Sequence, residues 1–139
     1  MIEKTLEVAA QKENLDKVFD FITDSLSLLS CPKKEFLQIK MVMEEFFINI
    51  ASYAYGENGG NVTISFLLYP EENKAYITII DSGMPFNPLE HDGPDTSLSL
   101  EEKPIGGLGI FYSRQKVDDM VYTYKDGKNI LCLTKVFSR

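Results

Sequence analysis

Residues 34–55 read KEFLQIKMVMEEFFINIASYAY, and this stretch indicates how the chain folds. Pro32 before it and Gly56 after it favour the start and the end of a helix. The apolar positions between them are Phe36, Leu37, Ile39, Met41, Val42, Met43, Phe46, Phe47, Ile48 and Ile50. A helix with so many apolar positions is buried by its neighbours. We therefore expect a long, heavily buried central helix from about Lys34 to Tyr55.

The segments before this helix favour a strand and a second helix. Residues 5–9 alternate polar and apolar side chains, as a half-buried strand does. Asn14 is suited to cap a helix that follows it. Between Leu15 and Leu29, apolar side chains recur at spacings of three and four, which predicts an amphipathic helix.

The segments after the central helix favour two hairpins and one short helix. Residues 62–66 and 75–80 have strand character and flank turn residues at 70–73. Strand-like residues 120–124 and 130–133 flank Asp126-Gly127, which is a hairpin turn signal. A short helix is expected over 110–117. Antiparallel hairpins with helices collected on one face predict an α+β fold, a two-layer sandwich with a mostly antiparallel sheet.

Length and charge limit the classes of function. A chain of 139 residues is expected to form a single domain, spanning residues 1–139. Its 14 Lys and Arg against 21 Asp and Glu give a net charge of −7, which disfavours direct nucleic-acid binding. Residues 1–11 do not resemble a signal peptide, and no apolar run has membrane-spanning length. We expect a cytoplasmic protein with no membrane contact and with Cys31 and Cys132 reduced.

Three short motifs are candidates for chemistry, and each also has a purely structural explanation. Glu45 and Asn49 are four residues apart on one helix face, but taken alone this spacing is weak and a solvated stripe explains it. Asp81-Ser82-Gly83 offers a carboxylate to an exocyclic amine and an open backbone to a flat ring, although these residues also favour turns. Gly106-Gly107-Leu108-Gly109 exposes N–H groups at a helix start, where phosphates bind, but it would also suit a hinge.

A long loop rich in Gly, Pro and acidic residues separates the second and third motifs, between Asp81 and Pro104. Loops of this length in a compact domain are often lids or binding loops. The only histidine, His91, lies in it and is expected to be solvated, as are the acidic residues Glu90, Asp92, Asp95, Glu101 and Glu102.

The order of the three motifs resembles the GHKL (histidine-kinase-like) ATPase superfamily, and most closely its anti-sigma factor serine/threonine kinase branch. Glu45-x-x-x-Asn49 followed by Ala54-Tyr55 resembles the N box of that family. Residues 81–88, DSGMPFNP, resemble its first glycine box, and residues 105–110, IGGLGI, resemble its second. The resemblance covers nearly the whole chain and implies the Bergerat-type ATP-binding fold.

The resemblance also implies cofactors and residue roles. ATP and Mg²⁺ would be the cofactors, with Asn49 as metal ligand, Asp81 as acceptor for the adenine amine and a lid at about residues 87–104. The cofactor-binding residues would be Asn49, Asp81, Gly83, Phe86, Gly106, Gly107, Leu108 and Gly109. Glu45 would be the catalytic base, one helical turn before the metal ligand.

The implied activity is that of a serine/threonine protein kinase and anti-sigma factor. Its substrate would be a hydroxyl of an anti-sigma factor antagonist, its other partner a sigma factor, and its state a homodimer. A non-catalytic ATP-binding regulatory module and a slow ATPase are the alternatives. The chain departs from many relatives at Tyr53, where they carry histidine, and at Gly127-Lys128-Asn129, where they carry threonine before the last strand.

Overall fold

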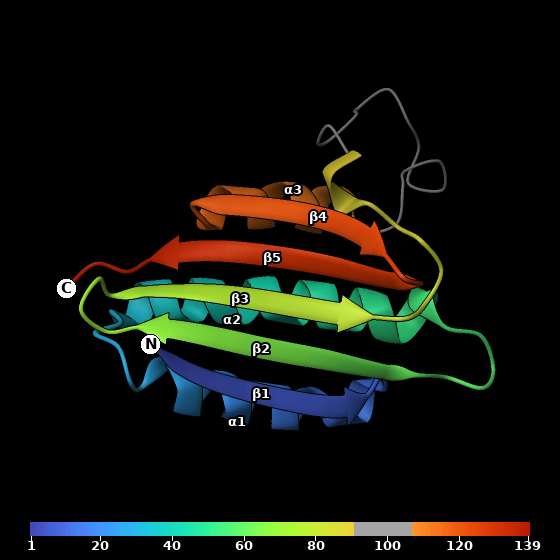
Figure 1. The fold of residues 1–139 in the computed structure, drawn as a ribbon, viewed down its shortest axis with the longest axis horizontal. Helices are drawn as coiled ribbons and strands as arrows, with labels where there is room; N and C mark the ends of the chain where they lie inside the picture. The colour runs from blue at the N-terminus through green and yellow to red at the C-terminus, as the bar shows by residue number, and fades with distance from the viewer. Residues whose placement is uncertain (91–106) are drawn as a thin grey trace.

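The computed structural model of the chain describes residues 1–90 and 107–139 (Figure 1). Within these residues, five strands form one sheet in the order β1-β2-β3-β5-β4, and every neighbouring pair is antiparallel. Both predicted hairpins are present, as β2–β3 and β4–β5. The strands are β1 (Ile2–Ala9), β2 (Asn61–Tyr69), β3 (Lys74–Asp81), β4 (Asp119–Lys125) and β5 (Lys128–Val136).

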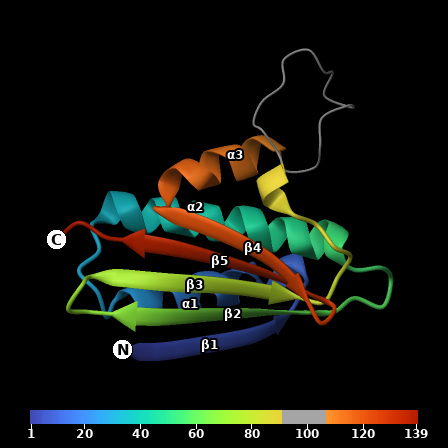
Figure 2. The same cartoon turned by 45° about the horizontal axis from the view of Figure 1, so that its top comes forward.

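The described residues contain three helices on one face of the sheet, behind it in Figure 1 and partly above it in the turned view of Figure 2. They are α1 (Leu15–Leu26), α2 (Lys33–Asn49) and α3 (Gly107–Lys116). Two 3₁₀ turns, η1 (Lys12–Asn14) and η3 (Pro88–Glu90), and one π turn, η2 (Ile50–Ala54), complete the described elements. This arrangement confirms the predicted α+β two-layer sandwich.

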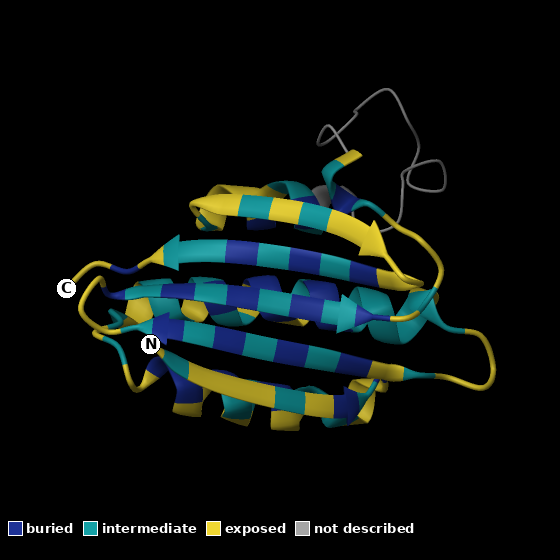
Figure 3. Cartoon of the chain, in the orientation of Figure 1, coloured by how far each residue is buried: buried dark blue, intermediate teal, exposed yellow. Residues whose placement is uncertain are grey.

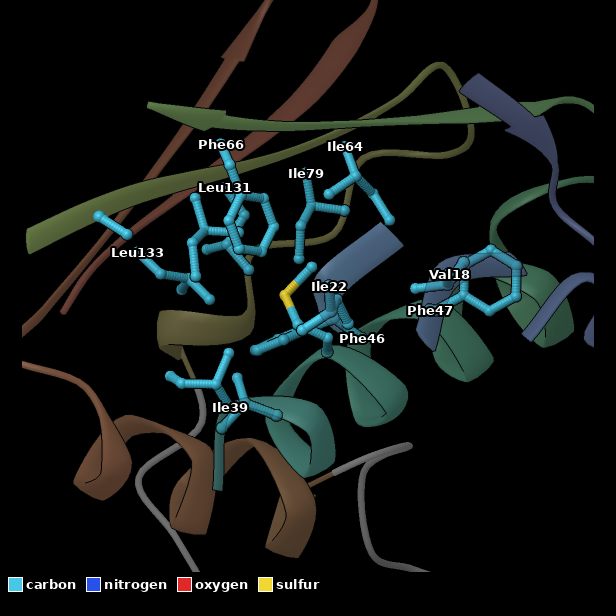
Figure 4. Packing of buried hydrophobic residues seen from close by; sticks show 14 of the residues in the cluster. Val18, Ile22, Ile39, Phe46, Phe47, Ile64, Phe66, Ile79, Leu131 and Leu133 are labelled. Carbon is cyan, nitrogen blue, oxygen red and sulfur yellow. The ribbon is translucent and has the colours of Figure 1, made fainter. Parts of the chain in front are cut away.

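The core lies between the sheet and the helices. Alternate residues of β2 are buried, beginning with Val62, and the same alternation runs along β3 and β5 (Figure 3). Ile64 of β2 is paired with Ile79 of β3, and both side chains point toward Phe46 and other side chains of α2 (Figure 4). Each large apolar side chain buried here contributes about 1.5–3 kcal/mol to folding. The core therefore holds the end of α2 against the end of β3 and the start of β5.

The central helix differs from its prediction in two ways. Its buried positions form one stripe at helical spacing: Ile39, Val42, Met43, Phe46 and Phe47. Leu37 and Met41 lie off this stripe and are 43% and 69% exposed, so the helix is buried along one face and less heavily than expected. The α-helix also ends at Asn49, and the chain continues as the π turn η2 rather than as regular helix to Tyr55.

The first helix and its cap also differ from prediction. Asn14 makes no capping hydrogen bond to α1; its Nδ2 donates instead to the carbonyl of Ala9, at 2.9 Å. The bond ties the start of the helix to the end of β1. The helix ends at Leu26 rather than Leu29, because the chain turns toward α2.

The two hairpin turns use left-handed backbone. Asp126 and Gly127 both have positive φ, 54° and 76°, as a two-residue hairpin loop requires. Asn73, at the end of the β2–β3 turn, has φ 54° and is only 2% exposed. Its Nδ2 donates to the carbonyls of Ser30, Phe137 and Ser138, and its Oδ1 accepts from the N–H of Ser30. One side chain thus joins this turn to the α1–α2 connection and to the C-terminal segment.

Candidate nucleotide site

A cavity of about 130 Å³ opens where α2 and β3 end, at the opposite end of β3 from Asn73. Most of its lining is apolar. The polar side chains that reach it come from separate elements: Asn49 from α2, Tyr53 from η2, Asp81 from β3, and Tyr122 and Asn129 from the β4–β5 hairpin. Phe86 also lines it. The structure therefore brings together Asn49, Asp81 and Phe86, three of the predicted cofactor-binding residues.

Asp81 is a buried carboxylate, 6% exposed, at the last position of β3. A buried carboxylate requires hydrogen-bond donors. Oδ1 accepts two hydrogen bonds, from the N–H of Gly83 at 2.9 Å and from Nδ2 of Asn129 at 3.0 Å. Because the protein donates to Oδ1, Oδ2 is the oxygen that a ligand amine would use.

Gly83 has a structural requirement that the sequence did not indicate. A Cβ at this position would overlap the carbonyl oxygen and the side chain of Ala54, in the π turn. The next residue, Met84, donates its N–H to the same carbonyl at 2.9 Å. Gly83 is thus needed for close contact between the end of β3 and the end of the central helix. Its predicted contact with a flat ring stays a prediction.

Glu45 and Asn49 are in contact, and the glycine run reaches them. Nδ2 of Asn49 donates to Oε1 of Glu45 at 3.2 Å. A Cβ on Gly109 would collide with the Glu45 carboxylate, so this carboxylate lies against the first turn of α3. The first N–H groups of a helix have no partner within that helix and attract anions. The Glu45–Asn49 pair of α2 and the glycine run at the start of α3 therefore lie side by side.

The remaining glycine-run predictions are described only in part. Gly107 is the first residue of α3, and Leu108 follows it in the helix. Gly106 lies outside the described residues, and so does most of the predicted lid, residues about 87–104, including His91. Only its first residues are described, with Pro88–Glu90 as the turn η3.

Tyr55 joins the start of β2 to the segment that follows β3. Its hydroxyl donates to the carbonyl of Asn61 at 2.6 Å and accepts the N–H of Ser82 at 2.7 Å. A Cβ on Gly60 would overlap the Tyr55 ring, so that glycine allows the ring to lie against the chain. The tyrosine that closes the predicted N box thus has a structural role beside the pocket.

Asn129 and Tyr122 are site residues that sequence reasoning missed. Asn129 is 7% exposed and contacts Asp81 directly. The Tyr122 hydroxyl donates to Oδ1 of Asn129 at 2.5 Å. Burial raises the pKa of Tyr122, and the nearby charge of Asp81 raises it further, although the backbone of Phe86 lowers it. The phenol is therefore protonated at neutral pH and can donate. The only signal in the sequence was the departure from relatives at 127–129.

The donor set suits a cation shared with a ligand rather than one enclosed by protein. In residues 1–90 and 107–139, no three His, Cys, Asp or Glu side chains gather where they could hold a metal ion. Asn49 offers an amide oxygen and Glu45 a carboxylate, and both are hard oxygen donors of the kind that Mg²⁺ prefers.

The described part of the chain also contains no helix that is both long and apolar enough to span a bilayer.

Relatives with similar sequences are named serine-protein kinase RsbW. The chain is 34% identical over 105 residues to serine-protein kinase RsbW of Bacillus thuringiensis (strain Al Hakam), covering 73% of this chain and 64% of that protein. RsbW of Bacillus cereus (strain AH820) is 33% identical over the same coverage. The chain thus spans 64% of the length of these relatives.

A solved structure supports the fold. The crystal structure of the RsbU and RsbW domains of a Mycobacterium tuberculosis protein matches with a TM-score of 0.69 and 15% identity, over 100% of this chain and 33% of that one. Residues 8–135 match the histidine kinase-like ATPase domain, which is nearly the whole chain. The chain therefore belongs to the histidine kinase-like ATPase family, as its three motifs predicted.

Proposed function

We propose that the protein is an ATP- and Mg²⁺-dependent serine/threonine kinase that acts as an anti-sigma factor and phosphorylates an anti-sigma factor antagonist. The observation that carries the proposal is the position of Glu45, which contacts Asn49 and lies against Gly109. A candidate base thus lies where the metal ligand and the phosphate-binding turn meet. The similarity to serine-protein kinases named RsbW supports the same activity.

The nucleotide would bind with its base in the cavity and its phosphates at α3. Oδ2 of Asp81 would accept from the adenine amine, since Oδ1 already has two donors. Gly83 and Phe86 would border the base. Gly106, Gly107, Leu108 and Gly109 would hold the phosphates through backbone N–H groups and the dipole of α3. Residues 1–139 would form one domain, with the lid at about 87–104 covering the nucleotide.

Asn49 would hold Mg²⁺ through its side-chain oxygen. Because Nδ2 of Asn49 donates to Glu45, the amide is oriented, and Oδ1 is the atom available to a cation. When bound, the ion would neutralise phosphate charge during transfer. An acidic chain with net charge −7 needs such a cation, since its average field repels ATP.

Glu45 would take the proton from the attacking serine or threonine hydroxyl as that oxygen bonds to the γ-phosphorus and the bond to ADP breaks. The Asn49 amide limits the rotation of the carboxylate and keeps it near the phosphate-binding turn. The proton moves from the hydroxyl to a carboxylate oxygen of Glu45, and ADP leaves with the electron pair of the broken bond.

The test is transfer of labelled phosphate from ATP to an antagonist protein, with Glu45→Gln as the decisive variant. Gln keeps an oxygen that can accept from Asn49 but cannot act as a base at neutral pH. We expect transfer to fall roughly 10²- to 10⁴-fold while the ATP dissociation constant stays within about threefold. No transfer by the wild-type protein to any antagonist that it binds would count against the kinase.

The same experiment separates the alternative functions. A non-catalytic module would bind ATP and change its affinity for partners, and Glu45→Gln would leave this response intact. A slow ATPase would release phosphate with no protein substrate present.

In the proposed function the partners are a sigma factor and its antagonist. The protein acts as a homodimer in the cytoplasm, with no nucleic-acid or membrane contact.

A further inference from the structure

The side chain of Asn129 uses all of its hydrogen-bonding capacity at the pocket wall. Nδ2 donates to Oδ1 of Asp81 and to the carbonyl of Met84, both at 3.0 Å. Oδ1 accepts from the N–H of Phe86 at 3.1 Å and from the hydroxyl of Tyr122 at 2.5 Å. An amide has two donor hydrogens and an oxygen with two lone pairs, so every position is used.

These partners allow only one orientation of the amide. Rotating it by half a turn would set its oxygen against the Asp81 carboxylate and its NH₂ against the Phe86 N–H. Both contacts would be repulsive, and the cost is high for a residue that is 7% exposed. The Asn129 amide therefore always presents its NH₂ group, and not its oxygen, to Asp81.

The fixed orientation of the Asn129 amide also fixes the Asp81 carboxylate. With Gly83 it places two donors on Oδ1, which sets the rotation of the carboxylate and leaves Oδ2 as the acceptor for a ligand. Asn129 has no donor left for the base, so it does not bind the base itself. Its contribution to recognition acts through Asp81.

Asn129 also holds the chain that follows Gly83. It binds the carbonyl of Met84 and the N–H of Phe86, so both sides of this short segment are attached to β5. Met84 and Phe86 both line the cavity, and the predicted lid begins directly after them. One side chain therefore positions both the carboxylate and the adjoining wall.

We propose that Asn129, supported by Tyr122, is a positioning residue that makes the pocket select a base with an exocyclic amine. The proposal rests on the proposed ATP binding. The amine donates to Oδ2 of Asp81, and a base that lacks the amine leaves this buried acceptor unpaired. Without Asn129 the carboxylate rotates, and the advantage of the amine falls.

The test measures the dissociation constants of ATP and of purine riboside triphosphate, which has hydrogen in place of the amine, by calorimetry. The ratio of the two constants gives the preference for the amine. We expect the wild-type protein to prefer ATP, Asn129→Ala to reduce this preference about tenfold, and Tyr122→Phe to reduce it about threefold. Asp81→Asn gives the lowest preference for the amine with which the other variants are compared, because it removes the carboxylate acceptor itself.

Asn73→Ala is the matched control, since it removes an equally buried asparagine from the opposite end of the sheet. We expect it to lower stability and leave the preference unchanged. Equal weakening of both nucleotides by Asn129→Ala would overturn the proposal and leave only a structural role. Tyr122→Phe provides the same test if Asn129→Ala does not fold. Failure of the wild-type protein to bind ATP would instead overturn the proposed function.

Discussion

Two buried asparagines, Asn73 and Asn129, lie at opposite ends of the sheet and use the same chemistry in different ways. Both are almost fully buried, at 2% and 7% exposure, and both make four hydrogen bonds. The partners of Asn73 are all backbone atoms. The partners of Asn129 include the side chains of Asp81 and Tyr122, and it lines a cavity.

The difference shows how to separate a structural asparagine from one at a binding site. Bonds to backbone atoms hold chain segments together and have no further effect. A bond to a carboxylate beside a cavity also determines what that carboxylate presents to a ligand. Burial and the number of hydrogen bonds are alike at the two ends, so the identity of the partners and the adjoining cavity separate the two asparagines.

The largest expected effect is that of Asn73→Ala on stability. The change leaves several backbone groups without partners and places alanine at φ 54°, so we expect a loss of about 3 kcal/mol in the free energy of unfolding. Urea denaturation measures it. Asn14→Ala, which removes a single side-chain bond to Ala9, is the control and should cost about 1 kcal/mol. Equal losses in the two variants would refute the view of Asn73 as a joining residue.

A smaller effect is expected at the pocket end, from Gly109→Ala. The new methyl group occupies the space of the Glu45 carboxylate, which is the end of a flexible side chain and can move aside. Stability should change by less than about 1 kcal/mol, while phosphoryl transfer falls at least about tenfold because the base is displaced. Transfer assays and thermal unfolding on the same sample check both. Unchanged transfer would show that the position of Glu45 against α3 has no part in catalysis.

The smallest effect concerns Cys31, at the Asn73 end. Burial raises its pKa to about 11, the charge of Glu35 adds to this, and Lys135 opposes it. Since the thiolate is the nucleophile, alkylation by iodoacetamide at pH 8 should be slower in the folded chain than in denaturant. The raised pKa favours folding below pH 9, and this contribution is lost as the pH rises through 11. Equal rates in folded and denatured chains at pH 8 would contradict it.

Much of the fold could be predicted because it depends on local patterns. Strand alternation, the Asp126-Gly127 turn and the amphipathic pattern of α1 follow from backbone geometry, which neighbouring residues determine. The exposure of Met41 and the π turn after Asn49 could not be predicted in this way. Both depend on what packs against the helix: α1, α3 and the sheet cover only part of it, and Ala54 in the π turn contacts Gly83 and Met84.

The sequence by itself determined which groups are available: the carboxylates Glu45 and Asp81, the amide Asn49 and the glycines of the two boxes. Their order along the chain was enough to predict the family. Only the tertiary structure decided that Gly109 makes room for Glu45 and that Asn129 holds Asp81. The physical reason is how far apart the interacting residues lie in the sequence. A helix or hairpin depends on residues that are close in sequence. A hydrogen bond between Asp81 and Asn129 exists only after β3 and β5 have paired.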